Sequence, residues 1–234
     1  MKQITKLFVL LAAVASLNGC RYVKVSKETR QEYADVKSGL NIKTKTLELP
    51  DFCNIDMAMA SELKFTQGES TSVQIVAPEA YIDNILAYVD GNTLIVNSKK
   101  KSFILGMRDV KFYITSPEIK QLTFSGAVDF STDGPVCTDY LNLCCNGAAE
   151  VEIDQLTAGG VELEVNGAGD IEIDRIDAKT LYININGAGD CTISGKADNV
   201  DVSMNGAGDV DITGLQVQTL SSSVNGAGKI SRPR

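Results

Sequence analysis

The chain has 234 residues, of which 44% are hydrophobic and 22% are charged, a balance typical of a folded globular protein. Its 30 acidic residues outnumber its 22 basic residues, which argues against nucleic acid as a partner and against charge-driven docking on anionic lipid. Histidine is absent, so a zinc centre is disfavoured and a serine or cysteine nucleophile lacks its usual base.

Residues 1–19 have the pattern of an export signal. Lys2 and Lys6 form a basic start, and the apolar stretch that follows is too short to span a bilayer as a helix. That stretch runs into Leu17-Asn18-Gly19-Cys20, which resembles the lipobox at the end of a bacterial lipoprotein signal. The resemblance implies that Cys20 is acylated and becomes the mature N-terminus, so that a lipid anchor makes the membrane a partner. The alternative is an ordinary secretory signal in which the cysteine occurs by chance.

Residues 20–40 are polar and have few periodic apolar positions. We predict that they form a tether between the lipid and the folded part. Without residues 1–19 the chain keeps 20 basic and 30 acidic residues, which suits a solvated protein of the cell envelope. We therefore expect attachment to the outer membrane, on either its periplasmic or its surface side.

Residues 41–115 have the pattern of short strands separated by turns. Apolar residues alternate with polar ones in segments 63–65, 73–77 and 110–114. Asp90-Gly91-Asn92 is typical of a hairpin turn in which glycine adopts a positive φ. Residues 82–87 fit one or two turns of helix. We predict an irregular strand region that is continuous with the repeats after it.

A repeated motif dominates residues 116–234. Its clearest copy is Asn166-Gly167-Ala168-Gly169-Asp170. The other copies, at steps of 19 to 21 residues, stand at 125–129, 146–150, 186–190, 205–209 and 225–229. After each copy, apolar residues alternate with polar ones, as in 171–185, which is the pattern of strands with one buried face. A nearly constant period of this length indicates stacked structural units.

Two architectures fit this repeat. In the first, Asn-Gly forms the turn of β-hairpins, and the chain is an antiparallel meander in a sandwich or barrel. In the second, each unit is one coil of about 20 residues in a parallel β-helix, and equivalent residues stack above one another. We favour the β-helix, because constant turn chemistry occurs at only one end of each unit. The predicted fold is all-β, with a β-helix at 116–234 after less regular short strands and hairpins.

Stacking would place the repeated polar residues in columns with a spacing of about 4.8 Å. In one column, amide side chains form a structural ladder at Asn146, Asn166, Asn186, Asn205 and Asn225. In a second column, carboxylates line up at Asp129, Glu150, Asp170, Asp190 and Asp209. Adjacent carboxylates repel one another, so Ca²⁺ is a candidate cofactor for the second column. The alternative is a solvated acidic face, because the period differs from that of the nonapeptide calcium repeat.

Five cysteines follow Cys20, and an odd number in an exported chain excludes complete internal pairing. Alignment of the repeats places Cys145 and Cys191 at positions that are apolar in other units. We predict that both are buried free thiols.

No residue pattern identifies an active site. Polysaccharide-cleaving enzymes also use β-helices and paired carboxylates, but the carboxylates here recur at the same phase in every unit. A catalytic pair would instead break the repeat at one level, beside a cleft. We therefore predict a protein without catalytic residues.

Three features together resemble a known family. They are the string of Gly-Ala-Gly repeats, the segment Leu63-Lys64-Phe65-Thr66-Gln67-Gly68 and the segment Asp90-Gly91-Asn92-Thr93-Leu94-Ile95-Val96. The family is described as "putative auto-transporter adhesin, head GIN domain" and is common among exported proteins and lipoproteins of Bacteroidetes. The resemblance covers about residues 45–230 and implies a right-handed β-helix with a less regular N-terminal part. It carries no catalytic residues over to this chain.

The function that we expect is that of a non-catalytic envelope lipoprotein with adhesin-like binding to a glycan or an envelope protein. Flat β-faces that carry ladders of side chains would serve such binding. The alternatives are a polysaccharide-active β-helix enzyme and a structural scaffold that forms homo-oligomers through the ends of the β-helix.

Overall fold

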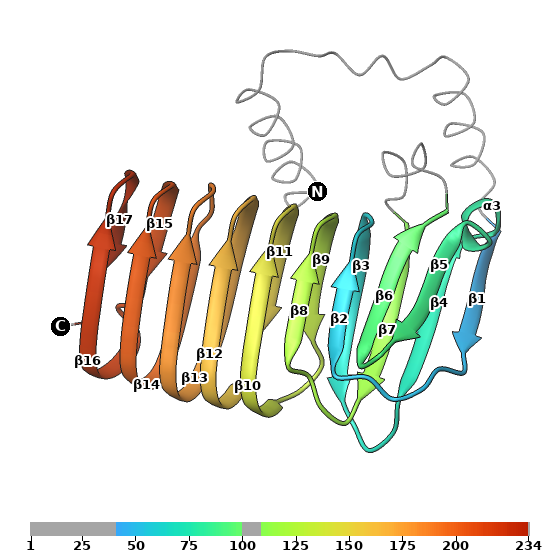
Figure 1. Cartoon of the computed structure of the whole chain (residues 1–234), viewed down its shortest axis with the longest axis horizontal. Coiled ribbons are helices and arrows are strands. Elements are labelled where there is room, and N and C mark those ends of the chain that lie inside the picture. Colours follow the sequence, from blue (N-terminus) through green and yellow to red (C-terminus); the bar gives the residue numbers. More distant parts are fainter. Residues whose placement is uncertain (1–40, 100–108, 234) are drawn as a thin grey trace, which may run out of the picture.

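The computed structural model describes residues 41–99 and 109–233, which form one long stack of β-strands (Figure 1). The predicted signal at 1–19, the tether at 20–40 and the lipidation site Cys20 lie outside the described residues. Within the described part, none of the helices has the length and the apolar character that a membrane crossing requires.

The repeats form the regular part of the stack. Its strands are β10 (Val136–Cys145), β11 (Ala148–Ile153), β12 (Leu156–Val165), β13 (Ala168–Ile185), β14 (Cys191–Met204), β15 (Ala207–Asp211), β16 (Leu215–Val224) and β17 (Ala227–Ser231). Equivalent residues of successive repeats pair in parallel, as Val161 does with Leu181 and Leu181 with Val200. This register confirms the β-helix and excludes the antiparallel meander for the repeats.

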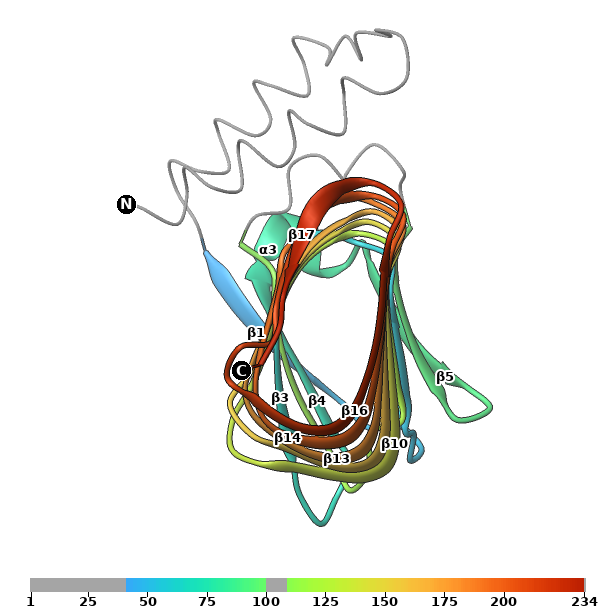
Figure 2. The same cartoon turned by 90° about the vertical axis from the view of Figure 1, so that its left-hand side faces the viewer.

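The direction of the coils gives the hand of the helix. Figure 2 shows the stack from its C-terminal end, where the chain runs counterclockwise as it advances toward the viewer. A path of this kind is right-handed, as the family resemblance implies.

Alternation of apolar and polar residues builds the core. In β12, Val161, Leu163 and Val165 point inward and are buried, whereas Glu162 and Glu164 between them are partly exposed. Equivalent residues of the other coils stack on them, so one continuous apolar cluster runs along the axis. Burial of each such side chain stabilises the fold by about 1.5–3 kcal/mol.

The corner of each repeat depends on its first glycine. A Cβ at Gly167 would overlap the carbonyl oxygen of Gly147, and a Cβ at Gly187 would overlap that of Gly167. The same overlap recurs along the column at Gly206 and Gly226. Backbones of adjacent corners therefore approach more closely than a side chain allows. This approach, rather than a hairpin turn, is the structural reason for the Asn-Gly repeat.

The strands that precede β10 extend the same stack. They are β1 (Ile42–Leu47), β2 (Asn54–Met57), β3 (Ser61–Gln67), β4 (Ser72–Pro78), β5 (Ile85–Asp90), β6 (Thr93–Ser98), β7 (Lys111–Ser116), β8 (Gln121–Phe124) and β9 (Ala127–Thr132). Strands β8 and β9 join the repeats directly, because β8 pairs in parallel with β10 and β9 with β11.

One coil of this region is out of sequence order. Strand β2 pairs in parallel with β6 on one edge and with β8 on the other. Strand β3 pairs likewise with β7 and with β9. The coil made of β2 and β3 is therefore inserted between two coils that the chain forms later. We call it the inserted coil.

Antiparallel strands and one helical turn close the N-terminal end of the stack. Strands β5 and β6 form a hairpin with Gly91 at φ 58°, which confirms the predicted turn. Strand β4 pairs antiparallel with both β1 and β7. Helix α3 (Glu79–Ile82) buries Tyr81 and Ile82 in the core. The prediction of helix at 82–87 is wrong beyond Ile82, because that segment leads into strand β5.

Candidate functional site

The predicted asparagine column is a hydrogen-bonded ladder. Asn166 Nδ2 donates to Asn146 Oδ1 at 3.1 Å, and Asn186 Nδ2 donates to Asn166 Oδ1 at 3.1 Å. Asn205 donates to Asn186 at 3.2 Å, and Asn225 donates to Asn205 at 3.2 Å. Since each amide joins one coil to the next, the column stabilises the stack and does not form a ligand site by itself.

The predicted carboxylate column also stands in register. Asp129 aligns with Glu150, and Glu150 aligns with Asp170. The Asp170 carboxylate accepts a hydrogen bond from the backbone N–H of Asp190 at 3.3 Å, and the Asp190 carboxylate accepts one from the backbone N–H of Asp209 at 2.8 Å. These two carboxylates therefore satisfy backbone donors where residues 189–190 are not in a strand.

Lysines stand at both ends of the carboxylate column. Glu62 of the inserted coil aligns with Asp129, and Lys111 lies 2.6 Å from the Glu62 carboxylate. At the other end, Lys229 aligns with Asp209. Across residues 41–99 and 109–233, no three carboxylate or thiol side chains are placed to hold a metal ion. Two carboxylates of the column thus accept backbone hydrogen bonds, and the Lys111–Glu62 ion pair stands beside its N-terminal end.

Cys145 and Cys191 are buried and free, which confirms the prediction for both thiols. Burial raises the pKa of each to about 12. The thiolate is the reactive form of cysteine, so neither side chain is a nucleophile near neutral pH.

The repeat breaks at one level, in β12. Gly160 pairs with Tyr140 of the preceding coil and with Thr180 of the following coil. Its neighbour Gly159 lies against the Asp139 carbonyl, since a Cβ at Gly159 would be 2.7 Å from that oxygen. Two adjacent positions in this coil therefore carry no side chain.

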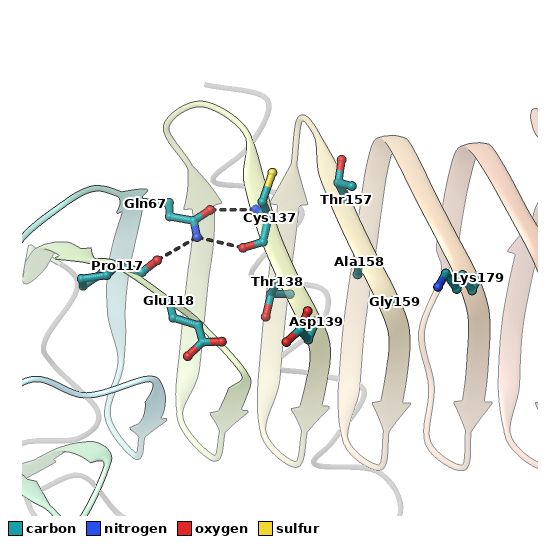
Figure 3. Close-up of a pocket in the computed structure, with 10 residues that line it drawn as sticks. All are labelled: Gln67, Pro117, Glu118, Cys137, Thr138, Asp139, Thr157, Ala158, Gly159 and Lys179. Atoms are coloured by element: carbon teal, nitrogen blue, oxygen red, sulfur yellow. Dashed lines mark hydrogen bonds between the residues drawn. The ribbon is translucent and has the colours of Figure 1, made fainter.

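An open hollow of about 580 Å³ lies at this break (Figure 3). Asp139, Thr157 and Lys179 line it from three successive coils, and Glu118 lines it from the segment before β8. Gln67 fixes one edge. Its Nε2 donates to the carbonyl oxygens of Pro117 and Cys137, both at 2.8 Å, and its Oε1 accepts from the Cys137 N–H at 2.7 Å. The edge is therefore held by three hydrogen bonds from one side chain.

Tyr140 stands beside the hollow and covers Gly160. A Cβ at Gly160 would be 2.9 Å from Tyr140 Cδ2, so the ring lies over this glycine. The Tyr140 hydroxyl donates to Glu162 Oε2 at 2.7 Å, and Asn142 Nδ2 donates to the same oxygen at 3.0 Å. The hydrogen bond to the Glu162 carboxylate raises the pKa of Tyr140 to about 12, so its hydroxyl remains protonated. Tyr182 pairs with Glu162 in the next coil.

We name the hollow together with Tyr140, Glu162 and Tyr182 the tyrosine flank. Sequence reasoning did not find it. One signal is visible in the sequence, because Gly159-Gly160 stands outside the corner motif, where other repeats have side chains. The two tyrosines are separated by two repeats, and only the stacking of coils brings them to one surface.

Comparison with protein families matches residues 51–232 to the family described as "putative auto-transporter adhesin, head GIN domain". A comparison with curated protein sequences finds no significant match.

Three crystal structures have a similar fold. A putative adhesin from Bacteroides fragilis is 22% identical, with 82% of this chain and 97% of that chain covered and a TM-score of 0.65. A putative adhesin from Parabacteroides distasonis is 15% identical, with 82% and 97% covered and a TM-score of 0.62. A putative lipid binding protein from the same species is 18% identical, with 81% and 96% covered and a TM-score of 0.56. These likenesses show the fold, and the family match goes further: the chain belongs to the auto-transporter adhesin head GIN domain family.

Proposed function

We propose that this protein is a non-catalytic binding module of the cell envelope, held at the outer membrane by a lipid on Cys20. Family membership supports an adhesin-like role. The observation that carries the proposal is the hollow lined by Gly159, where the absence of a side chain leaves room for a ligand between residues of three successive coils. A concavity with a few polar groups and an aromatic edge is the usual form of a binding site.

The charged groups around the hollow come from several coils. Lys120 pairs with Glu118 at 3.0 Å, and Asp139 and Lys179 stand two coils apart, about 10 Å along the axis. Groups that are spread in this way can contact separate parts of an extended ligand. Shortening of a polysaccharide by the purified protein would favour the polysaccharide-active enzyme over this proposal.

The hollow is tested by filling it from one exposed position. Thr157→Arg adds a long side chain at its lining, and we expect at least tenfold weaker binding of the mature chain to an array of envelope glycans and proteins. Thr192→Arg is the matched control, because Thr192 is also an exposed strand threonine but lies outside the hollow. Unchanged binding by Thr157→Arg would show that the ligand sits elsewhere.

The lipid anchor has its own test. Cys20→Ser should move the protein from the membrane fraction to the soluble fraction, because the acyl chains are the proposed attachment. If the Cys20→Ser variant and the wild type distribute equally between the membrane and soluble fractions, the lipid anchor is contradicted. The proposed binding function would not be affected by that result.

A second candidate function is self-association through the C-terminal end. Strand β16 pairs with β14 on one edge, and within the described residues its other edge has no strand partner. Its ten residues carry no charge, so the usual protection of an edge strand is missing there. Light scattering should then show dimers whose fraction rises with concentration. A monomer at all concentrations would remove this candidate.

A further inference from the structure

We propose that the ligand of the tyrosine flank is an uncharged carbohydrate chain that runs obliquely across the coils, from Tyr140 to Tyr182. This inference rests on the proposed binding function and names the chemical class of its ligand. It follows from the arrangement of the two rings, from the polar groups around them and from the charge of the flank.

Tyr140 is a preformed aromatic platform. One face of its ring covers Gly160, and its hydroxyl is held by Glu162, yet the residue is 42% exposed. The outward face of an aromatic ring is electron-rich and attracts the C–H groups on the flat side of a sugar ring. Because the ring is already fixed, little side-chain entropy is lost when a ligand stacks on it.

Tyr182 supplies a second ring farther along the axis. It is 48% exposed and pairs with Glu162, whose own coil lies between those of the two tyrosines. The two tyrosine backbones are thus two coils apart, about 10 Å along the axis, and Tyr182 stands two residues, about 7 Å, farther along its strand than the residue that aligns with Tyr140. A chain of a few linked sugar rings reaches both rings, whereas a single sugar contacts one.

Polar groups lie where the hydroxyls of such a chain would fall. Asp139 and Lys179 line the hollow immediately before Tyr140 and Thr180 in their coils. The Glu162 carboxylate and the Asn142 amide stand between the tyrosines. Carboxylates accept hydrogen bonds and ammonium groups donate them, so this set matches hydroxyls that do both.

The same residues argue against two other ligand classes. The carboxylates on this flank, Glu118, Asp139, Glu162 and Glu164, outnumber its lysines, Lys120 and Lys179, and the excess negative charge repels a polyanionic glycan. The residues that align with Tyr182 are Glu162 and Asp201, which are both charged, so the rings do not lie in an apolar patch. Protein interfaces place their aromatic anchors in well-packed, desolvated pockets, which this open surface lacks.

The test measures binding of the mature chain, in mild detergent, to four neutral hexasaccharides: β-1,4-linked glucose, xylose, mannose and N-acetylglucosamine. Polygalacturonate serves as the anionic probe. We expect at least one neutral hexasaccharide to bind, with at least tenfold weaker binding in Tyr140→Ala and in Tyr182→Ala. The matched control is Tyr113→Ala. Tyr113 is 41% exposed and lies on β7, which pairs with β3 on the side of the coil opposite β10 (Figure 2).

One further variant and a melting measurement separate the loss of ligand contacts from a loss of folding stability. Tyr140→Phe keeps the ring and loses the hydroxyl, so its binding should lie between those of the wild type and Tyr140→Ala. Circular dichroism should show unchanged melting for Tyr182→Ala and Tyr113→Ala, and a small loss for Tyr140→Ala, which also removes the hydrogen bond to Glu162.

The outcomes distinguish this inference from the proposed function. Preference for polygalacturonate, binding of none of the neutral chains, or loss of binding equal in Tyr113→Ala and Tyr140→Ala would overturn the carbohydrate inference. If envelope proteins still bind and Thr157→Arg abolishes that binding, the binding module survives with a different ligand. If Thr157→Arg binds every envelope component as the wild type does, the ligand sits outside the hollow, and the binding site assigned under the proposed function is wrong.

Discussion

The two parts of the stack are ordered differently. From β10 to β17, coils that follow one another in sequence are neighbours in space. From β1 to β9, the inserted coil lies between two coils that the chain forms later. The inserted coil and the repeats nevertheless both pair in parallel with their neighbouring coils and share one apolar core. Alternating apolar residues are therefore enough to form a coil. In the repeats, the corner motif also brings the backbones of adjacent coils closer together.

The corners show this difference in single residues. The inserted coil turns at Ala58-Met59-Ala60, and Met59 is fully buried. A Cβ at Gly126 in the neighbouring coil would overlap the Met59 carbonyl oxygen. Close approach at this corner thus needs glycine on only one of the two coils. In the repeats every coil has the glycine, so the close approach continues along the whole column.

The largest expected effect is at a corner glycine. Gly187→Ala should destabilise the protein by at least about 4 kcal/mol, because its Cβ overlaps a backbone carbonyl that cannot move without disturbing the next corner. Gly134→Ala is the control. Gly134 has φ 92° and open space around its Cβ, so only backbone strain of about 1–2 kcal/mol applies. Urea unfolding measures both, and similar costs would show that corner packing does not require glycine.

The inserted coil should stabilise the repeats next to it. Phe65→Ala removes a fully buried side chain and should cost about 3–5 kcal/mol. Because β3 pairs with both β7 and β9, hydrogen exchange should quicken in all three strands. Faster exchange confined to β3 would mean that the inserted coil and the repeats unfold independently.

The asparagine ladder belongs to the repeats and should contribute less. Asn186→Ala removes one hydrogen bond that it donates and one that it accepts, for a loss of about 1 kcal/mol. Asn225→Ala, at the end of the ladder, removes one side-chain bond and should cost about half as much. Thermal unfolding compares the two, and equal losses would argue against an additive ladder.

The smallest effect on stability is expected at Asp129, where the inserted coil meets the neighbouring coil. Burial, and then the neighbouring Glu62, raise the pKa of Asp129, while Lys111 lowers it. A raised carboxyl pKa means that the folded chain binds this proton more readily than the unfolded chain. The contribution of Asp129 to the stability of the fold therefore falls as the pH rises from the ordinary carboxyl pKa through the raised pKa.

Asp129→Asn should accordingly give a slightly higher melting temperature at pH 7. The gain should vanish below the ordinary carboxyl pKa, where the aspartate is protonated in both states. Asp174→Asn, at an exposed position outside the column, is the control. A gain at pH 3 as large as that at pH 7 would refute the electrostatic cause.

Much of the structure of the repeats at 116–234 could be predicted from local sequence patterns. The period of the corner motif and the alternation of Ile171 and Ile173 with charged residues indicate coils and their inward faces. The buried thiols Cys145 and Cys191 follow from the same alignment. In a stack of this kind each coil contacts mainly its neighbours in sequence, so a local pattern carries the fold.

Tertiary structure alone decided the rest. The inserted coil could not be predicted, because pairing of β2 with β6 and β8 joins segments whose separations follow no period. The tyrosine flank could not be predicted from the sequence for a related reason. Tyr140 and Tyr182 differ from the residues at their own repeat positions, and stacking turns those two exceptions into one surface. The sequence determines a repeated coil because the same packing problem recurs every 20 residues, whereas a site arises where side chains from different coils break that repetition together.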